Sequence, residues 1–254
     1  MDRKLIFAAI AVLAVAGLNL AAQAQSDVPS YDAAAVADPG RPASETARDA
    51  ERKPAEMLAF AGVKPGDKVV DLIPGGGYFT HLFSAAVGPT GVVYQFVPAE
   101  FAAFAKTAPP AVGSHPDPAR PNVVYLSAPV NSLATPEPVD LVWTSQNYHD
   151  LHDSFAKPAD LAQVNAAIFR ALKPGGIYVV LDHAALPGSG LSATETLHRI
   201  DPATVRAEVE AAGFVYVGES DVLRNPNDPH TAKVFDPSIR GHTDQFVFKF
   251  RKPG

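Results

Sequence analysis

Residues 69 to 77 read Val-Val-Asp-Leu-Ile-Pro-Gly-Gly-Gly, an apolar run that passes directly into a glycine-rich turn. We expect a strand over residues 67 to 72 and a helix over residues 78 to 87, with the turn between them. Glycines lack the Cβ atoms that would hold a ligand away from the backbone, and the free N–H groups at a helix N-terminus attract polar ligands. The stretch therefore predicts an α/β fold with a nucleotide-like cofactor beside Asp71 and the turn.

The spacing of these glycines differs from the fingerprint of dinucleotide-binding enzymes. That fingerprint is G-x-G-x-x-G, whereas the three glycines here are consecutive and Pro74 occupies the turn. The sequence therefore disfavours an NAD-dependent enzyme.

The N-terminal residues have the pattern of a cleavable secretory signal. Arg3 and Lys4 precede an apolar run over residues 5 to 20, and Ala22-Gln23-Ala24 follows it. A membrane anchor is the less favoured alternative, because the run is shorter than the roughly 20 residues that span a bilayer. We expect residues 1 to 24 to be a signal peptide, and the protein to be periplasmic or secreted with no stable membrane anchor after cleavage.

Composition excludes several classes of protein. The chain of 254 residues has a formal net charge of −6 at pH 7, so it lacks the basic footprint of a nucleic-acid-binding protein. It contains no cysteine, which excludes disulfides, a thiolate nucleophile and a zinc–thiolate site. With 47% hydrophobic residues, the chain is long enough for one α/β domain with an ordinary apolar core.

The chain alternates between expected strands and helices. Residues 25 to 43 are predicted to be a flexible leader without chemistry, followed by one domain over residues 44 to 254. The apolar runs lack the alternation of half-exposed strands, so we expect a sheet buried on both faces. The expected strands are 67–72, 92–97, 123–126, 139–144, 177–181, 214–219 and 245–250, and the expected helices are 44–61 with a break near Pro54, 78–87, 99–106, 158–172 and 202–212.

Three motifs together resemble the class I S-adenosylmethionine-dependent methyltransferases. They are the glycine-rich turn after the first strand, Leu-Lys-Pro-Gly-Gly at 172 to 176, and Ala-Gly-Phe at 212 to 214. The resemblance covers roughly residues 44 to 251 and implies a Rossmann-like seven-stranded sheet in the order 3-2-1-4-5-7-6, with strand 7 antiparallel and helices on both faces. The phrases V-D-L-I-P-G-G-G-Y-F-T and F-D-P-S-I-R-G-H-T-D-Q-F resemble a subgroup of exported methyltransferase-like proteins.

This resemblance implies S-adenosylmethionine as the cofactor. The residues predicted to bind it are Asp71, Gly75, Gly76, Gly77 and, as a substitute for a missing carboxylate, Glu100. Asp71 matches the acidic residue at the end of strand one, and Gly75 and Gly77 match the second and third glycines of the family's turn.

The sequence departs from the family pattern at three cofactor positions. Ile73 stands in the place of the first glycine, and Val97 stands where the family has a ribose-binding carboxylate, for which Glu100 is the nearest substitute. Ser127 stands where an Asp commonly holds the adenine amino group, and Asn131 is a weak substitute there. Each buried polar group left unpaired costs about 1–3 kcal/mol, so the loss of two anchors weakens affinity by orders of magnitude.

Polar residues after strands four and five are the candidates for catalysis. The carboxyl ends of parallel strands meet at the same edge of the sheet, where its strand order reverses. The resemblance places the segment after strand four opposite the transferred methyl group, so Asn147, Tyr148 and His149 are candidates for orienting or deprotonating a substrate. An equally weighted alternative is that His149 and His152 cap the next helix and satisfy loop carbonyls.

Two other polar groupings have a structural as well as a functional interpretation. Four residues near the ends of strands four and five have side chains suited to a divalent metal, namely His149, His152, Asp182 and His183, but without a recognised spacing no metal site is predicted. The long polar segment 220 to 244 and the residues around His198 could form a lid over an anionic substrate, although ion pairs that tie down the loops are the favoured interpretation. Tyr78 and Trp143 are expected to pack in the core.

Two functions remain in competition at this level. The first is a secreted methyltransferase that acts on a small-molecule substrate. The second is an exported binding or scaffold protein that kept the fold and lost the cofactor, as the three substituted positions suggest. A hydrolase is disfavoured, because the chain has neither a nucleophile elbow nor a cysteine.

Overall fold

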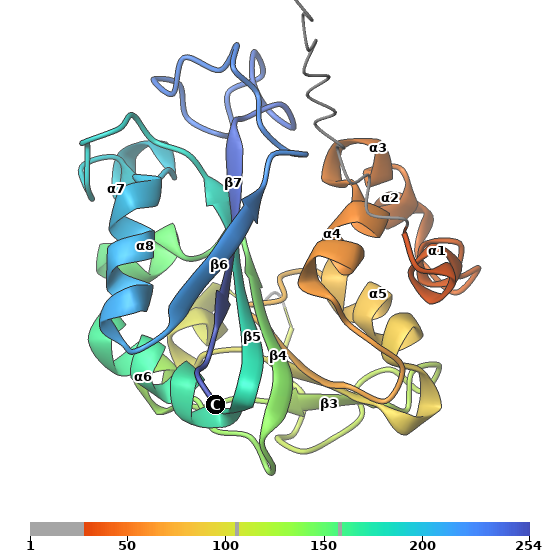
Figure 1. Cartoon of the computed structure of the whole chain (residues 1–254). Coiled ribbons are helices and arrows are strands. Elements are labelled where there is room, and N and C mark those ends of the chain that lie inside the picture. Colours follow the sequence, from red (N-terminus) through yellow and green to blue (C-terminus); the bar gives the residue numbers. More distant parts are fainter. Residues whose placement is uncertain (1–27, 105–106, 157–158) are drawn as a thin grey trace, which may run out of the picture.

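The computed structural model describes residues 28–104, 107–156 and 159–254, and the predicted signal peptide lies outside them. Seven strands form one sheet in the order β3-β2-β1-β4-β5-β7-β6, in which β7 alone is antiparallel to its neighbours (Figure 1). This confirms the predicted topology. The strands are β1 Lys68–Leu72, β2 Val92–Phe96, β3 Val123–Leu126, β4 Val139–Ser145, β5 Leu172–His183, β6 Val215–Ser220 and β7 Gln245–Arg251.

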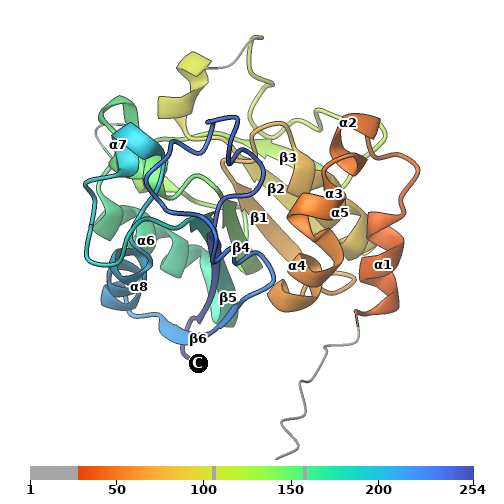
Figure 2. The ribbon, with the colours of Figure 1, turned by 90° about the horizontal axis from the view of Figure 1, so that it is seen from above.

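Helices cover both faces of this sheet (Figures 1 and 2). On one face lie α1 Ser30–Val36, α4 Pro54–Ala61 and α5 Tyr78–Val87, and on the other lie α6 Leu161–Ala171 and α8 Pro202–Ala211. Neighbouring strand residues enter different cores: Val69 packs with α4 and α5, whereas Val70 packs with α6 and α8. The strands are therefore apolar without alternation because both of their faces are buried.

Short helices lie in several of the connecting segments. They are α2 Ala43–Thr46, α3 Asp49–Arg52, α7 Thr194–Leu197, and the 3-10 helices η1 Gly88–Thr90, η2 Ala99–Phe104, η3 Val130–Ser132, η4 His149–His152 and η5 Ser154–Ala156. Among them, η1 leads from α5 into the amino end of β2. None of the helices within the described residues is long and apolar enough to cross a membrane.

The region expected to be one helix over residues 44 to 61 instead forms the three helices α2, α3 and α4. Lys53 has a left-handed backbone (φ 47°), and Pro54 begins α4. A proline disfavours the right-handed helical conformation at the residue before it. The chain therefore turns at Lys53 rather than continuing as a kinked helix.

The fifth strand is longer than its expected span of residues 177 to 181. The Lys-Pro-Gly-Gly motif lies inside β5 rather than before it, and the pairing with β4 shifts register between Val139 and Leu141. The amide of Gly175 donates to the carbonyl of Lys252, so backbone pairing continues across the expected turn.

Part of the segment predicted to be a flexible leader is helical in the structure. Residues 30 to 36 form α1, whose Ala35 is buried in the core with α4 and α5. Arg41 follows, and its guanidinium binds the carboxylate of Asp49 and the carbonyl of Val36. This segment is rich in Ala and Asp, and its order comes from tertiary contacts that composition does not reveal.

Asp32 in α1 makes folding stability depend on pH. Its carboxylate is fully buried and neither oxygen has a hydrogen-bond partner, so burial raises its pKa from 3.8 to about 6. The buried charge of Asp32 lowers the free energy of unfolding. This loss is absent below the pKa that Asp32 has in the unfolded chain, and it develops as the pH rises through its pKa in the folded protein. We expect Asp32→Asn to increase the free energy of unfolding at pH 8 by about 1–3 kcal/mol more than it does at pH 3.5.

Urea denaturation at both pH values measures this difference. Asp221→Asn, which alters an exposed carboxylate, is the control and is expected to change stability at pH 8 by less than Asp32→Asn does, since surface substitutions usually have small effects. If Asp32→Asn shifted stability equally at both pH values, the buried-charge interpretation would be wrong.

Candidate functional site

A cavity of about 410 Å³ lies beyond the carboxyl ends of β1 and β4. Its walls come from the turn after β1, the start of α5, the segment after β4 and the short helices α2 and α3. The strand order reverses between β1 and β4, and such a reversal is where open α/β sheets bind ligands. The lining residues are Ser44, Glu45, Arg48, Arg52, Asp71, Ile73, Pro74, Gly75, Gly76, Tyr78, Phe79, Ser145, Gln146 and Asn147.

Two of the three predicted cofactor glycines face this cavity. A Cβ atom built on Gly75 or Gly76 would meet no heavy atom within 4 Å. Gly77 is not in the wall: it precedes α5 with φ 88°, and a Cβ there would lie 3.5 Å from the ring of His81. Gly75 and Gly76 thus leave space for a ligand, whereas Gly77 supplies a left-handed backbone.

Asp71 lies at the base of the cavity. Its carboxylate accepts a hydrogen bond from the hydroxyl of Thr80 (2.6 Å). Burial raises the pKa of Asp71 to about 6, although Thr80 and the charge of Arg52 act against this rise. With a pKa of about 6, Asp71 is mostly ionised at neutral pH and can accept a further hydrogen bond from a ligand.

Two arginines that the sequence analysis did not single out form the opposite wall. Arg52 donates to the hydroxyl of Ser145 (2.9 Å), and its guanidinium lies over the rings of Tyr78 (4.4 Å) and Phe79 (4.9 Å). Burial, together with the charge of Arg48, lowers the pKa of Arg52 to about 10. Because both arginines line the cavity, they give this wall a positive charge suited to a carboxylate.

The sequence contained only a weak indication of this wall, namely that Arg48 and Arg52 are four residues apart, a spacing that places two residues on the same face of a helix. Their position over the cavity depends on how α2 and α3 fold back. Tyr78 packs as expected and also lines the cavity, and its hydroxyl donates to Asp49 (2.7 Å). Trp143 is fully buried against Phe79 and lies outside the cavity wall.

Two non-glycine residues in the cavity wall have left-handed backbones. Ile73 has φ 57° and Gln146 has φ 62°. Ile73 thus adopts a left-handed conformation that glycine would adopt without strain, and for a β-branched residue such strain costs about 1–3 kcal/mol. Asn147 bridges the two turns, since its amide donates to the carbonyls of Ile73 (2.8 Å) and Ser145 (2.6 Å). Asn147 therefore lines the cavity and positions its walls.

Tyr148 does not face the cavity. It is fully buried, and its hydroxyl donates to Glu208 (2.9 Å) and accepts from the side-chain amide of Asn165 (2.9 Å). Burial raises its pKa well above the usual range. The structure thus places Tyr148 in the core rather than in the cavity wall, where its hydroxyl joins α6 and α8.

His149 is held by Asp182 rather than exposed in the cavity wall. Its Nδ1 lies 2.8 Å from Oδ1 of Asp182, and its amide donates to Oδ2 of the same carboxylate. Burial alone would lower the pKa of His149, but Asp182 and Asp150 outweigh it and raise that pKa to about 10. In this arrangement His149 already carries its proton at neutral pH, so it is not poised to act as a general base.

The four side chains considered for a metal do not converge. His152 contacts Glu208 through Nε2 (3.2 Å), and His183 contacts the hydroxyl of Thr243 through Nδ1 (2.7 Å). Burial lowers the pKa of His183 to about 3, so this ring is neutral.

Glu100, the expected ribose ligand, also lies outside the cavity wall. Both of its carboxylate oxygens accept from the amide of Val130, at 3.2 and 3.1 Å. Asn131 Oδ1 accepts from the amide of Asp160 (2.9 Å), and neither Val97 nor Ser127 lines the cavity. The cavity thus extends from the glycine turn toward β4, and its described lining includes no side chain from the ends of β2 and β3.

A second cavity of about 150 Å³ adjoins the first and shares Arg48, Arg52 and Gln146 with it. The segment 220–244 contributes most of its far wall, including Phe235 and Arg240, and lies above the ends of the central strands (Figure 2). One buried ion pair ties this segment to the rest of the domain, Arg199 with Asp228, and a second pair lies within the segment, Arg224 with Asp244. The segment is therefore both a tied loop and a cavity wall.

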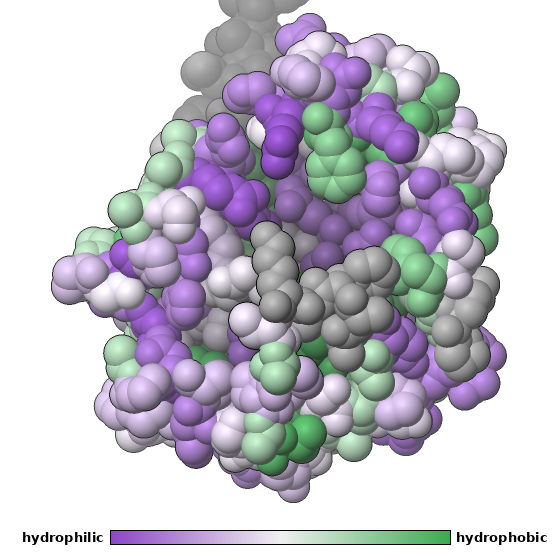
Figure 3. All heavy atoms as spheres, turned by 180° about the vertical axis from the view of Figure 1, so that it is seen from behind, coloured by the Kyte–Doolittle hydropathy of each residue, from purple (hydrophilic) through white to green (hydrophobic). Residues whose placement is uncertain are grey.

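Seen from behind, the molecule has a hollow in which hydrophilic residues gather (Figure 3). The lining of the first cavity is likewise rich in polar and charged side chains. A polar or charged ligand fits this lining better than an apolar one.

Comparisons with solved structures show that this chain has the fold of the class I S-adenosylmethionine-dependent methyltransferases. A SAM-dependent methyltransferase from Aquifex aeolicus is 16% identical with a TM-score of 0.51, and the match covers 81% of this chain and 98% of that one. The glycopeptide N-methyltransferase MtfA, complexed with sinefungin, is 15% identical with a TM-score of 0.52, covering 82% and 87%. The [4+2]-cyclase SpnF is 18% identical with a TM-score of 0.54, covering 80% and 81%. No family model and no curated protein matches the sequence.

Proposed function

We propose that this protein is a methyltransferase that takes its methyl group from S-adenosylmethionine and acts on a small molecule. The observation that carries this proposal is the cavity at the switch point of a methyltransferase-type sheet, into which Gly75 and Gly76 admit a ligand. When bound, the cofactor supplies an activated methyl group on a sulfonium centre.

The residues of the cavity fit the amino-acid half of this cofactor. Arg48 and Arg52 face the space beside the glycine turn, where they would bind the carboxylate of the methionine portion. Asp71 would accept from its ammonium group. The adenosine half has fewer partners, because Glu100 is engaged by Val130.

The acceptor would enter through the second cavity, which shares Gln146 and the two arginines with the first. Arg240 adds a further positive charge there. This favours an acceptor that carries a negative charge. The chain's role in the reaction would be to align the acceptor with the methyl group, because His149 is held by Asp182.

Calorimetric titration with S-adenosylmethionine and S-adenosylhomocysteine tests the proposal directly. We expect micromolar dissociation constants for both, and weaker but measurable binding of methionine alone. Adenosine alone is the discriminating control and is expected to bind more weakly than methionine. A flat titration at millimolar cofactor would contradict the proposal.

Ile73→Gly is expected to strengthen S-adenosylhomocysteine binding about tenfold, equivalent to about 1.4 kcal/mol. The substitution removes a side chain from the cavity wall and so enlarges the space for the ligand, whereas relief of the left-handed strain at this position acts on stability rather than on affinity. The same titration measures the change. Weaker binding after this substitution would show that the Ile73 side chain contacts the ligand favourably.

A binding or scaffold protein without cofactor use is the second candidate function. It is favoured by one observation, namely that neither Glu100 nor the residues at the ends of β2 and β3 line the cavity. Thermal stabilisation by an anion that lacks adenosine, with no response to S-adenosylhomocysteine, would support this alternative.

We also propose that the protein is exported, on the pattern of residues 1 to 24. N-terminal sequencing of the protein from the producing cell is expected to show a mature chain that begins at Gln25. A chain that retains its apolar run in the membrane fraction would contradict this.

A further inference from the structure

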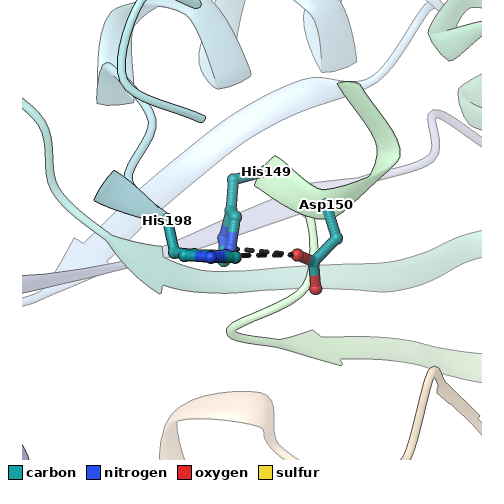
Figure 4. Close-up of side chains that lie close together, drawn as sticks. All are labelled: His149, Asp150 and His198. Atoms are coloured by element: carbon teal, nitrogen blue, oxygen red, sulfur yellow. Dashed lines mark ion pairs between the residues drawn. The ribbon is translucent and has the colours of Figure 1, made fainter. Parts of the chain in front are cut away.

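His149, Asp150 and His198 bring three potential metal ligands together outside the cavity described above (Figure 4). One ligand atom from each of the three lies within 4.8 Å of the other two. Nε2 of His149 is 3.2 Å from Oδ1 of Asp150, and Nδ1 of His198 is 3.8 Å from the same oxygen. The residues come from η4 and from the position after α7. We propose that they bind one divalent transition-metal ion of the zinc or cobalt type.

The orientation of His149 supports this proposal. Its Nδ1 faces Oδ1 of Asp182, so its Nε2 faces Asp150. The carboxylate of Asp182 is fully buried and also accepts from the amides of His149 and His183, which fixes its position. Metal-binding histidines commonly donate their second ring N–H to a carboxylate in this way, which sets the tautomer and orients the ring.

His198 is also held in place. Its backbone is left-handed (φ 55°), and its ring packs against Phe235 of segment 220–244, with centroids 4.9 Å apart. Its ring and that of His149 are nearly perpendicular, at 82°, with centroids 5.5 Å apart. The two rings therefore do not stack on each other, and each presents a nitrogen to Oδ1 of Asp150.

Charge and access also suit a cation. Asp150 and Asp182 place two carboxylates around the histidines, and Asp153 adds a third whose buried Oδ1 has no hydrogen-bond partner. The side chains of His149, Asp150 and His198 are 3%, 18% and 26% exposed, so the cluster opens to solvent on one side. Two imidazoles and one carboxylate with open positions are a ligand set for Zn²⁺ or another first-row metal. A bound metal would take the place of the proton on Nε2, which passes to solvent.

Titration of the tag-free, chelator-treated protein with Co²⁺, followed by visible absorption, and with Zn²⁺, followed by calorimetry, tests the site. We expect one equivalent to bind with a micromolar or lower dissociation constant. Zn²⁺ is also expected to raise the melting temperature, since a ligand of the native state alone stabilises it. These readouts do not depend on methyl transfer, so failure here would leave the proposed function standing.

Two variants test the location of the site, and a third variant is their matched control. His198→Ala and the nearly isosteric Asp150→Asn are each expected to weaken binding at least 100-fold and to abolish the thermal shift. His115→Ala, which removes an exposed histidine from the loop before β3, is expected to leave both unchanged. No saturable binding by the wild type would overturn the proposal. So would binding that survives both substitutions, since the ion would then be adventitious.

Discussion

Replacing Arg199 by Met is expected to lower the free energy of unfolding by about 3–5 kcal/mol, because it leaves a buried carboxylate without its cation. The side chains of Arg199 and Asp228 are both 0% exposed, and Nη1 of Arg199 donates to Oδ2 of Asp228 at 2.8 Å. The same guanidinium donates to the carbonyls of Ala184 and Ala232. Burial alone would raise the pKa of Asp228, but backbone amides and Arg199 hold it below its usual value. One side chain therefore joins the end of β5 to segment 220–244.

Arg224→Met is the matched control for this prediction. Arg224 also pairs with a buried carboxylate of the same segment, Asp244, at 2.8 Å, but its own side chain is 43% exposed. Water can replace much of that interaction, so we expect a loss of only about 0–1 kcal/mol. Urea denaturation monitored by circular dichroism measures both variants. Equal losses for the two would show that burial of the pair does not decide its contribution.

The Arg199 variant has a second expected consequence at the site. Segment 220–244 supplies one wall of the second cavity, so loss of its anchor exposes this segment to local unfolding. Hydrogen exchange in 220–244 should therefore accelerate more than in β1 or β4. Uniform acceleration across the sheet would indicate global destabilisation instead.

Replacing Gly75 by Leu is expected to weaken S-adenosylhomocysteine binding at least 100-fold, a change of about 2.7 kcal/mol or more. A Cβ at this position points into open space in the cavity wall, so the larger side chain occupies the room that the proposed cofactor needs. Calorimetric titration measures the affinity. Because φ is +57° at Gly75, the substitution also strains the backbone, and this effect must be separated from the loss of space.

Gly190→Leu makes that separation possible. Gly190 has nearly the same φ, +56°, and likewise has no heavy atom within 4 Å of a built Cβ, but it lies outside the cavity. Both variants should lose similar stability through backbone strain, about 1–2 kcal/mol, while only Gly75→Leu loses affinity. Unchanged affinity in Gly75→Leu would show that the cofactor site has been misplaced.

Local sequence patterns predicted much of the fold. The apolar runs around Val69 and Val142 predicted buried strands because a strand covered on both faces has no polar alternation. The glycine turn predicted where β1 ends and α5 begins, because few other residues allow a backbone to turn so closely to a ligand. The order of the strands came from the family resemblance, since local patterns do not specify which strands are neighbours.

Side-chain direction after β4 was not predictable in the same way. Gln146 leaves the strand with a left-handed backbone, a conformation that nothing in its side chain favours. As a result, three consecutive candidates have three different environments: Asn147 lines the cavity, Tyr148 enters the core, and His149 binds Asp182.

By itself, the sequence determined the strands, the glycine turn, the absence of cysteine chemistry and the departures from the methyltransferase pattern at Ile73, Val97 and Ser127. The tertiary structure alone decided which charges face the ligand space. Arg48 and Arg52 reach the cavity because the short helices α2 and α3 fold over the ends of β1 and β4. His149 and His198 meet because two loops far apart in the chain converge. Such contacts depend on loop backbones that are set by burial and long-range pairing, which no local pattern encodes.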